Sequence, residues 1–407
     1  MTRPRRLIAL LAPAGLWLGA GCVTMAQDAT GPRSASLPVT LDHNRMIVEV
    51  ELVRPDGTIR KAQAWVDTGN PDLLVGEKLA HELGIEPLAQ KEEGTQYAQV
   101  WASRTPAIRL GGLVLDTASI RTKILPGASV LPGVPAEANL PSSALRRDRF
   151  VFDYPARRLT VARPGPSKSR GIAIPCRVNA STGLFQVSAR VDGETVQLGV
   201  DNGSAGTWVS ETLTRAWQVH HPDWPRATGA VGSTNFFGFP FESQGELMRF
   251  PELGIGPLTA RDLGVLGLEQ GLFDWYSGKT AGPVVGFIGA NVLVGFRVEI
   301  DLPHGMTYWE AGPPPVPGDL DIVGLTLRPE VDGTFTLAGV VTRDGQPLVK
   351  GVQVGDKLLR IDGLDTANAT MGTVANALRG KPGIAHSLVV ERAGKQISVE
   401  AKVAHLP

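Results

Sequence analysis

Two short acidic turns carry the residues of this chain with the clearest chemical potential. Each turn follows an apolar run and has the form Asp-x-Gly, with Asp67 in "AWVDTGNPDLLV" and Asp201 in "LGVDNGSAGTWV". Two carboxyl groups held close together cannot both ionise cheaply, so such a pair shares one proton. The ionised member can then accept a proton from water while the protonated member polarises a carbonyl. One Asp-x-Gly alone is weak evidence, because these residues also form ordinary turns.

An internal repeat places both turns in the same structural frame. At a constant offset of 134 residues, "VDTGNPDLLVGEKLAHELGI" from Val66 matches "VDNGSAGTWVSETLTRAWQV" from Val200 at six positions. Alternating strands with an Asp-Gly hairpin signal precede each turn. A short helix is predicted after each, over 76–83 and 210–218. The closing hairpins "RFVFDYPARRLTV" and "RVEIDLPHGMTYW" match at an offset of 148. We call residues 37–163 repeat 1 and residues 171–312 repeat 2, with a linker between them.

On these residues, each repeat resembles the retropepsin-like aspartic proteases. In that family a strand ends in hydrophobic-Asp-Thr/Ser-Gly, and a hydrophobic-hydrophobic-Gly segment and a closing hairpin follow. The resemblance implies two acid-protease β-barrel lobes related by a pseudo-two-fold axis, each giving one aspartate to a shared site. It implies that Asp67 and Asp201 are the catalytic pair of a monomer that hydrolyses polypeptides. The residues expected to support the turns are Thr68, Gly69, Asn202, Gly203, Ser204 and Gly289.

The supporting residues have distinct expected roles. Gly69 and Gly203 would allow the two turns to approach closely and to adopt positive φ. The Thr68 hydroxyl would reach across to the backbone of the other repeat. The Ser204 hydroxyl lies where members of the family often bond the carboxylate.

Two positions depart from the family pattern. Asn202 replaces the usual Thr or Ser, and an amide differs from a hydroxyl in reach, so we expect an asymmetric brace. Repeat 2 contains the expected Ile288-Gly289, but the equivalent of Gly289 in repeat 1 is Pro141. Proline removes a backbone donor and fixes φ, so we expect the strand behind the Asp67 turn to be altered.

A third segment, residues 320–407, follows the spacer-like sequence "AGPPPVPGD". The phrase "GVQVGDKLLRIDG", the helical "TMGTVANALRG" and the strand pair "HSLVVERAGKQISVEAKV" together resemble a PDZ domain of the bacterial protease-associated kind. The resemblance places "IVGLTL" at the carboxylate-binding loop and implies that Gly324, Leu325 and Thr326 bind a peptide C-terminus. The alternative is a PDZ-shaped brace that binds no ligand. We call residues 320–407 the C-terminal module.

Residues 1–26 have the build of a bacterial secretory signal. The sequence "MTRPRRLIALLAPAGLWLGAGC" runs from basic through apolar to small residues, and it is too short and interrupted for a good membrane span. "LGAGC" resembles a lipobox, which implies lipidation at Cys22, whereas a cut after "TMA" would release a soluble protein. Either alternative predicts export to the periplasm, with membrane contact only through that lipid. Cys176, the other cysteine, lies in an apolar run and is expected to be buried.

Composition and missing motifs argue against other classes of function. Lys plus Arg equals Asp plus Glu at 40 each, without a long basic run after the first few residues, so we expect no nucleic-acid partner. His220 and His221 lack further ligands at metal-binding spacing, so no metal is expected. No Gly-rich phosphate loop or Gly-x-Ser-x-Gly frame is present, which argues against a nucleotide cofactor and a serine hydrolase.

The sequence therefore predicts a mainly β protein that acts as a secreted aspartic endopeptidase, with a PDZ domain that recruits protein substrates. The aromatic stretch 232–243 is either a flap over the substrate or a core strand. One alternative is a catalytically inactive peptide-binding envelope scaffold, in which Asn202 and Pro141 mark loss of activity. Another is a structural lipoprotein without a cleft.

Overall fold

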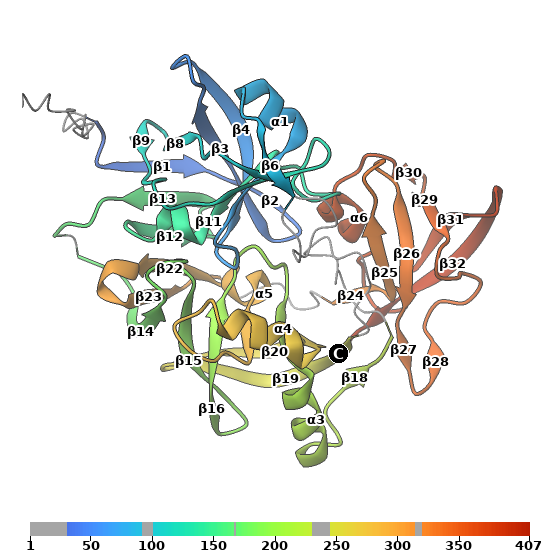
Figure 1. Ribbon diagram of the computed structural model, residues 1–407. Helices are drawn as coiled ribbons and strands as arrows, with labels where there is room; N and C mark the ends of the chain where they lie inside the picture. Colours follow the sequence, from blue (N-terminus) through green and yellow to red (C-terminus); the bar gives the residue numbers. More distant parts are fainter. Residues whose placement is uncertain (1–30, 92–100, 167, 230–244, 314–319) are drawn as a thin grey trace, which may run out of the picture. The chain divides into compact units, whose positions relative to one another are not determined.

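The structure is mainly β, as the sequence predicts (Figure 1). It is a computed structural model that describes residues 31–91, 101–166, 168–229, 245–313 and 320–407. Residues 32–407 belong to one structural unit. Among the described residues, no helix combines the length and apolarity needed to cross a membrane. The signal sequence with Cys22 and the aromatic stretch 232–243 lie outside the described residues.

Repeat 1, with strand β1 that crosses its first residues, contains both antiparallel and parallel strand pairs. Its elements are β1 (Ser34–Pro38), β2 (Thr40–Asp42), β3 (Arg45–Val53), β4 (Ile59–Asp67), β5 (Leu73–Gly76), α1 (Glu77–Leu83), β6 (Pro87–Lys91), β7 (Trp101–Ser103), β8 (Ala107–Leu110), β9 (Leu113–Val114), β10 (Thr122–Leu125), β11 (Ala138–Pro141), α2 (Ser142–Leu145), β12 (Arg149–Asp153) and β13 (Arg158–Ala162).

Repeat 2 has a corresponding series of elements. They are β14 (Ile172–Val178), β15 (Phe185–Val191), β16 (Glu194–Val200), β17 (Thr207–Ser210), α3 (Glu211–His220), β18 (Arg226–Ala227), β19 (Glu246–Ile255), β20 (Leu258–Leu268), α4 (Gln270–Ser277), β21 (Gly286–Ile288), α5 (Ala290–Leu293), β22 (Phe296–Asp301), the 3₁₀ turn η2 (Leu302–His304) and β23 (Met306–Ala311).

The two repeats position their acidic turns with the same strand pairings. In repeat 1, β11 runs parallel to β4 and antiparallel to β5, and β10 runs parallel to β5. In repeat 2, β21 runs parallel to β16 and antiparallel to β17, and β20 runs parallel to β17. Each acidic turn therefore lies where a central strand, with pairing strands on both sides, passes into the next element.

Short helices follow both turns, close to their predicted ranges. The first, α1, ends at Gly84, whose left-handed φ of 64° closes the last turn and suits glycine. The second, α3, begins after Ser210, whose hydroxyl accepts from the Thr212 amide as an N-cap. It extends to His220, two residues beyond the predicted end.

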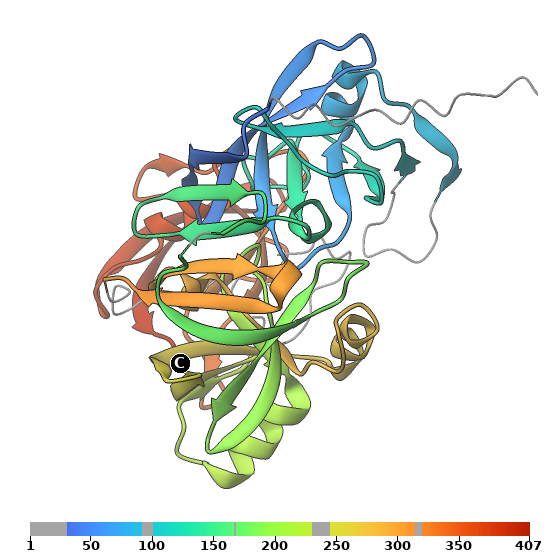
Figure 2. The ribbon, with the colours of Figure 1, turned by 90° about the vertical axis from the view of Figure 1, so that its left-hand side faces the viewer.

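The closing hairpins join the end of repeat 1 to the sheet of repeat 2, whereas β2 to β11 of repeat 1 form a sheet of their own. Hairpin β12–β13 pairs with hairpin β22–β23 through β12 and β22, with Phe150 opposite Ile300. Figure 2 shows these green and orange hairpins side by side. Strand β1 forms one end of this sheet beside β13, and on the other side β14 pairs with β23 and leads into β15 and the other strands of repeat 2. Buried Phe150, Phe152 and Trp309 place the main apolar core against these strands.

The C-terminal module forms a separate sheet with its own core. Its strand order is β24-β32-β31-β29-β26-β25, and β30 pairs with β29. The expected helix and final strand pair are present as α6 and β31–β32. The elements are β24 (Asp321–Val323), β25 (Leu325–Pro329), β26 (Phe335–Val340), β27 (Thr342–Arg343), β28 (Gln346–Pro347), β29 (Lys357–Ile361), β30 (Leu364–Asp365), α6 (Met371–Ala377), β31 (Ala385–Arg392) and β32 (Lys395–His405).

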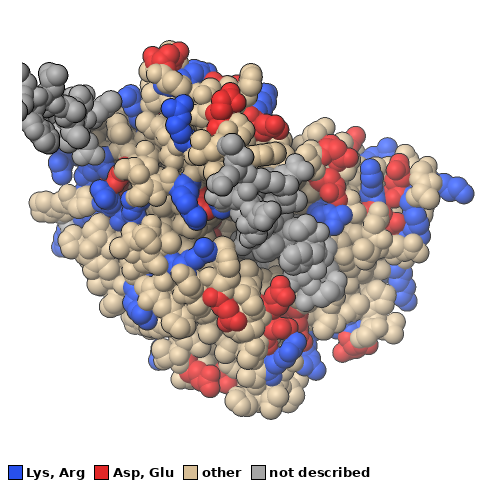
Figure 3. Space-filling model, viewed as in Figure 1, with Lys and Arg blue, Asp and Glu red and all other residues tan. Residues whose placement is uncertain are grey.

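The surface reflects the balanced composition. On the face shown in Figure 3, acidic and basic side chains are interspersed among uncharged ones. Cys176 is buried, as predicted, and burial raises the pKa of its thiol to about 12. It therefore behaves as a small apolar side chain.

Candidate active site

The strand pairings bring Asp67 and Asp201 to equivalent places. Asp67 is the last residue of β4 and pairs in register with Pro141 of β11. Asp201 follows β16, and its amide donates to the Ile288 carbonyl at 2.9 Å. Both side chains are almost wholly buried, with 4% of Asp67 and 1% of Asp201 exposed.

Each carboxyl group lies against the glycine of the opposite turn. A Cβ on Gly69 would stand 2.4 Å from Cγ of Asp201. A Cβ on Gly203 would stand 2.5 Å from Oδ1 of Asp67. Neither glycine has a positive φ, so the expectation of left-handed turns is wrong at these positions. Close approach alone explains glycine here, because a side chain at either position would collide with the opposite carboxyl group.

Thr68 and Asn202 brace the two turns across the repeats. The Thr68 hydroxyl lies 3.0 Å from the Val200 carbonyl and accepts from the Asn202 amide at 3.2 Å. In return, Oδ1 of Asn202 accepts from the Thr68 amide at 3.0 Å. The side-chain oxygen Oδ1 of Asn202 thus accepts the hydrogen bond that a Thr or Ser hydroxyl would accept. The link between the two turns is therefore kept despite the Asn at this position.

The brace is asymmetric at the nitrogen of Asn202. Within the described residues, neither Nδ2 of Asn202 nor the Tyr154 hydroxyl completes a hydrogen bond of standard geometry. The two groups nevertheless face one another, and burial raises the pKa of Tyr154 far above its usual value. A tyrosine from the closing hairpin of repeat 1 therefore lies beside the position where repeat 2 departs from the family pattern.

Asn139, which the sequence analysis missed, supports the Asp67 turn. Its Oδ1 accepts from the Leu74 amide at 2.6 Å, and its Nδ2 donates to the Asp72 carbonyl at 3.1 Å. The same Nδ2 lies 3.5 Å from Oδ2 of Asp67. The available signal was a polar residue in the apolar segment two positions before Pro141.

Pro141 and Gly289 meet different surroundings at equivalent positions. A Cβ on Gly289 would stand 2.0 Å from the Gly206 carbonyl oxygen, so only glycine fits there. Its amide donates to the Thr207 hydroxyl at 3.1 Å. Pro141 has no such donor, and in repeat 1 the neighbouring loop is held by the Asn139 side chain instead.

Ser204 has a different role from the one expected. Its hydroxyl donates to the Gly206 carbonyl at 2.7 Å rather than to a carboxylate. The backbone amide of Gly203, at 2.8 Å, and then that of Ser204 favour the ionised form of Asp201. The turn geometry explains the difference, because the hydroxyl closes the loop on itself.

Arg45 is a buried cation next to this acidic pair, and the sequence analysis also missed it. Its Nε donates to the Gly203 carbonyl at 3.0 Å, and 2% of the residue is exposed. Burial lowers the pKa of Arg45 to about 10, whereas Asp42, Asp201 and Asp67 oppose that shift. At the start of an apolar strand, an arginine reads as an ordinary surface residue, so sequence patterning gave no signal for it.

The two carboxyl groups differ in their electrostatic surroundings. Burial and the charge of Asp201 raise the pKa of Asp67 well above its usual value. Burial raises the pKa of Asp201 to about 6, while the amides of Gly203 and Ser204 oppose the shift. The pair therefore retains a proton at mildly acidic pH, with the ionised form favoured at Asp201. Such a pair can act as acid and base together.

The remaining predicted site residues lie in the C-terminal module. Gly324, Leu325 and Thr326 are all buried at and after the end of β24. The Gly324 carbonyl accepts from the Val341 amide at 2.9 Å, and β25 pairs with β26. Within the described residues, no group of three or more His, Cys, Asp or Glu side chains could hold a metal ion.

Comparisons with known proteins give weak similarity to solved structures alone. No family model matches the chain, and no curated protein matches it. Among solved structures, the chain is similar to the crystal structure of an aspartic proteinase from Irpex lacteus. The identity is 15% and the TM-score 0.43, over 70% of this chain and 99% of that chain. At this level of similarity, function has to be argued from the geometry of the acidic turns.

Proposed function

We propose that this protein is an aspartic-type endopeptidase in which Asp67 and Asp201 activate one water molecule. The observation that carries the proposal is the reciprocal packing of each carboxyl group against the glycine of the opposite turn. Two buried carboxyl groups in such an arrangement share a proton. The duplicated strand pairings supply both turns from one chain, so a monomer is sufficient.

In the proposed reaction, the Asp201 carboxylate accepts a proton from water as the water oxygen attacks the peptide carbonyl. Asp67 donates its proton to the carbonyl oxygen, which gives a neutral tetrahedral diol. The C–N bond then breaks as the amine nitrogen takes the proton from Asp201, and a diol hydroxyl returns its proton to Asp67. The products are a carboxylic acid and an amine, and the dyad regains its starting state without a covalent intermediate.

The C-terminal module is proposed to act as a PDZ domain that presents polypeptide substrates. Support comes from the sequence resemblance and from the position of β25, which begins at Leu325 directly after Gly324 and stands at the end of the sheet order. A peptide added beside an edge strand gains backbone hydrogen bonds. Export to the periplasm, with a lipid at Cys22 as one alternative, rests on the N-terminal sequence.

A catalytically inactive peptide-binding scaffold is the second candidate. The observation that favours it is the incomplete hydrogen bonding of Nδ2 of Asn202 within the described residues. A loosened brace would leave the carboxyl groups out of working geometry, since catalysis tolerates little misplacement. In that case the dyad residues would affect stability but not peptide hydrolysis.

Unfolded casein provides a direct test between these candidates. The purified protein would be incubated with it between about pH 4 and pH 7, and new amino termini would be counted. Asp67→Asn should abolish cleavage, whereas the exposed Asp223→Asn control should retain it. Equal rates for the wild type and Asp67→Asn would refute the dyad, and a folded but inactive wild type would favour the scaffold.

A further inference from the structure

The hairpin β2–β3 connects the acidic pair with the C-terminal module. Its turn residues His43 and Asn44 have φ values of 49° and 64°, typical of a tight hairpin turn with two left-handed residues. Asp42 and Arg45 are directly opposite one another in the strand register. The two oppositely charged residues at the tip therefore lie next to each other, and each also contacts a different part of the molecule.

Arg45 contacts the acidic side. Its guanidinium bonds the carbonyl of Gly203, the glycine that packs against Asp67. A buried cation is costly unless opposite charges and hydrogen bonds compensate for lost hydration. Three carboxyl groups supply that compensation. The charge of Asp42 raises the pKa of Arg45 most, followed by the charges of Asp201 and Asp67. Asp42 therefore shares the charge of Arg45 with the acidic pair.

Asp42 contacts the C-terminal module. Its Oδ1 accepts from the Gly372 amide at 3.0 Å, and its Oδ2 accepts from the Thr370 hydroxyl. A Cβ on Gly372 would stand 2.7 Å from both Oδ2 of Asp42 and the His43 amide nitrogen. Only glycine allows α6 to approach the hairpin so closely.

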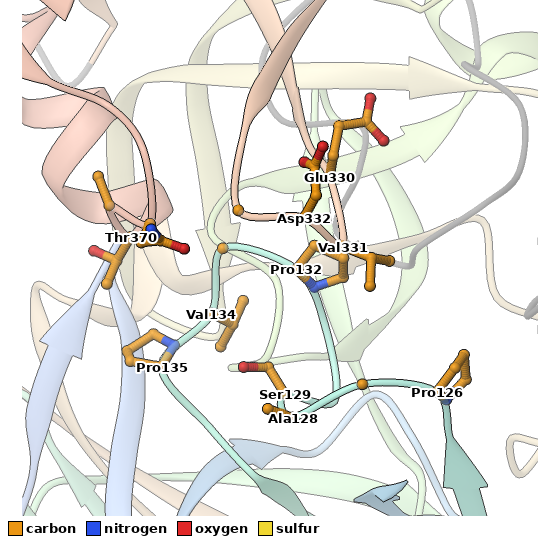
Figure 4. Close-up of a pocket in the computed structure, with 15 residues that line it drawn as sticks. Pro126, Ala128, Ser129, Pro132, Val134, Pro135, Glu330, Val331, Asp332 and Thr370 are labelled. Atoms are coloured by element: carbon orange, nitrogen blue, oxygen red, sulfur yellow. The ribbon is translucent and has the colours of Figure 1, made fainter. Parts of the chain in front are cut away.

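A second contact fixes the same end of α6. The Met371 amide donates to the Gly133 carbonyl at 2.7 Å, and a Cβ on Gly133 would collide with Pro329. A pocket of about 360 Å³ opens beside this contact, lined by the loop 126–135 and by 330–333 and 368–370 (Figure 4). In Figure 4, Thr370 and Val331 of the C-terminal module lie on opposite sides of the pocket. Repeat 1 contributes the loop with Val134 to the same pocket.

His43 and Tyr154 near the tip are neutral, whereas Arg379 is a second cation whose charge reaches His43. Burial and the charges of Arg45 and Arg379 lower the pKa of His43 well below its usual value, so it carries no charge near neutral pH. Tyr154, which feels the charge of Asp201, has a raised pKa and is also neutral. Arg45 is thus the cation that acts on both members of the acidic pair.

We propose that Arg45 is a positioning residue for the Asp67–Asp201 pair and that the C-terminal module sets its effect by holding Asp42. The catalytic role of Arg45 rests on the proposed function. Its electrostatic effect on the two aspartates is expected even if they do not catalyse peptide hydrolysis. The module would then be an internal effector of the site as well as a substrate-recruiting domain.

The signs of the expected effects follow from charge. Arg45 favours the ionised forms of both aspartates, so Arg45→Met should raise the titration midpoints of both carboxyl groups. Arg45→Lys keeps the charge and should leave most of the effect. Asp42→Asn removes a competing anion and should lower the midpoints.

Module contact has its own expected sign. Gly372→Ala should separate α6 from Asp42, so that Asp42 interacts more strongly with Arg45. Arg45 would then stabilise the ionised forms of Asp67 and Asp201 less, and their titration midpoints should rise. Gly271→Ala is the matched control, because a Cβ at that helical glycine meets nothing within 4 Å. Thermal unfolding would identify any variant that fails to fold, and the opposite signs for Asp42→Asn and Gly372→Ala test the proposal without Arg45→Met.

The experiment is a carbon NMR titration of the full chain with labelled aspartate carboxyl groups, assigned with Asp67→Asn and Asp201→Asn. The pH–rate profile on casein would be measured in parallel. Opposite shifts for Arg45→Met and Asp42→Asn support the proposal, whereas unmoved midpoints overturn it even if rates fall. Shifted midpoints in a protein without proteolysis would reject the proposed function but retain the electrostatic role of Arg45.

Discussion

The hydroxyl of Thr68 offers a sharp test of the brace between the two turns. Thr68→Val keeps the side-chain shape but removes the group that lies between the Val200 carbonyl and the Asn202 amide. Thr68 and Asn202 are wholly buried, so water cannot replace the lost partner. The substitution therefore leaves two backbone groups without that bond and creates almost no cavity.

The expected cost follows from the energy of unpaired buried groups. Each of these two groups costs about 1–3 kcal/mol, so Thr68→Val should lower the free energy of unfolding by about 2–6 kcal/mol. Thr68→Ser retains the hydroxyl and loses one methyl group, for which the cost is about 1 kcal/mol. The hydroxyl, rather than the methyl group, should therefore dominate.

Urea unfolding of the wild type and both variants would measure these differences by linear extrapolation. Tryptophan fluorescence is a suitable signal because Trp65 is buried within 2.9 Å of a Cβ built on Gly203. The rate of casein cleavage should fall in the same order, with Thr68→Val slower than Thr68→Ser. If the valine and serine variants were equally stable within about 0.5 kcal/mol, the brace would not contribute as described.

Three further predictions concern the charges and amides around the site. The pKa of Asp201 is about 6 in the folded state against an ordinary value of 3.8. The free energy of unfolding contributed by this group therefore falls as the pH rises from about 4 to about 6, and the loss is complete above about pH 6. Asp201→Asn should thus stabilise the protein by up to about 3 kcal/mol at pH 7, with the gain vanishing below about pH 4; a pH-independent difference in urea unfolding would contradict this. Asn139→Ala leaves the Leu74 amide and Asp72 carbonyl without these partners and should cost about 2–6 kcal/mol in urea unfolding, against under about 1 kcal/mol for the exposed Asn376→Ala. Glu299→Leu breaks the buried ion pair with Arg149 between the closing hairpins and leaves Arg149 with Asp301 at 3.6 Å, so it should cost about 2–3 kcal/mol, whereas loss of the exposed Lys61–Glu49 pair in Glu49→Gln should cost under about 1 kcal/mol in the same assay.

Repetition in the sequence was sufficient to predict the local architecture of both turns. The offset between Asp67 and Asp201, the strand before each and the helix after each all follow from matched apolar periodicity and turn residues. The closing hairpins were predicted for the same reason. Their mutual pairing through β12 and β22 was not predicted, because matched periodicity within each repeat carries no information about pairing between repeats.

The residues that adjust the site were beyond reach of sequence patterning. Arg45 looks like the first residue of a surface strand, and only the tertiary structure buries it beside the dyad. Asn139 and Tyr154 act through contacts to a neighbouring loop and to the other repeat. Ser204 was misassigned because a hydroxyl two residues into a turn can bond either the carboxylate or the turn itself.

Cooperation between the two aspartates is the central claim, and a mutant cycle tests it most directly. The rate of casein cleavage would be measured for Asp67→Asn, Asp201→Asn and the double variant, with Asp223→Asn as control. Residues that act as one catalytic unit are strongly non-additive, so each single variant should lose at least about 1,000-fold and the double variant scarcely more. Cleavage that survives in either single variant, or losses that multiply in the double variant, would contradict a shared dyad.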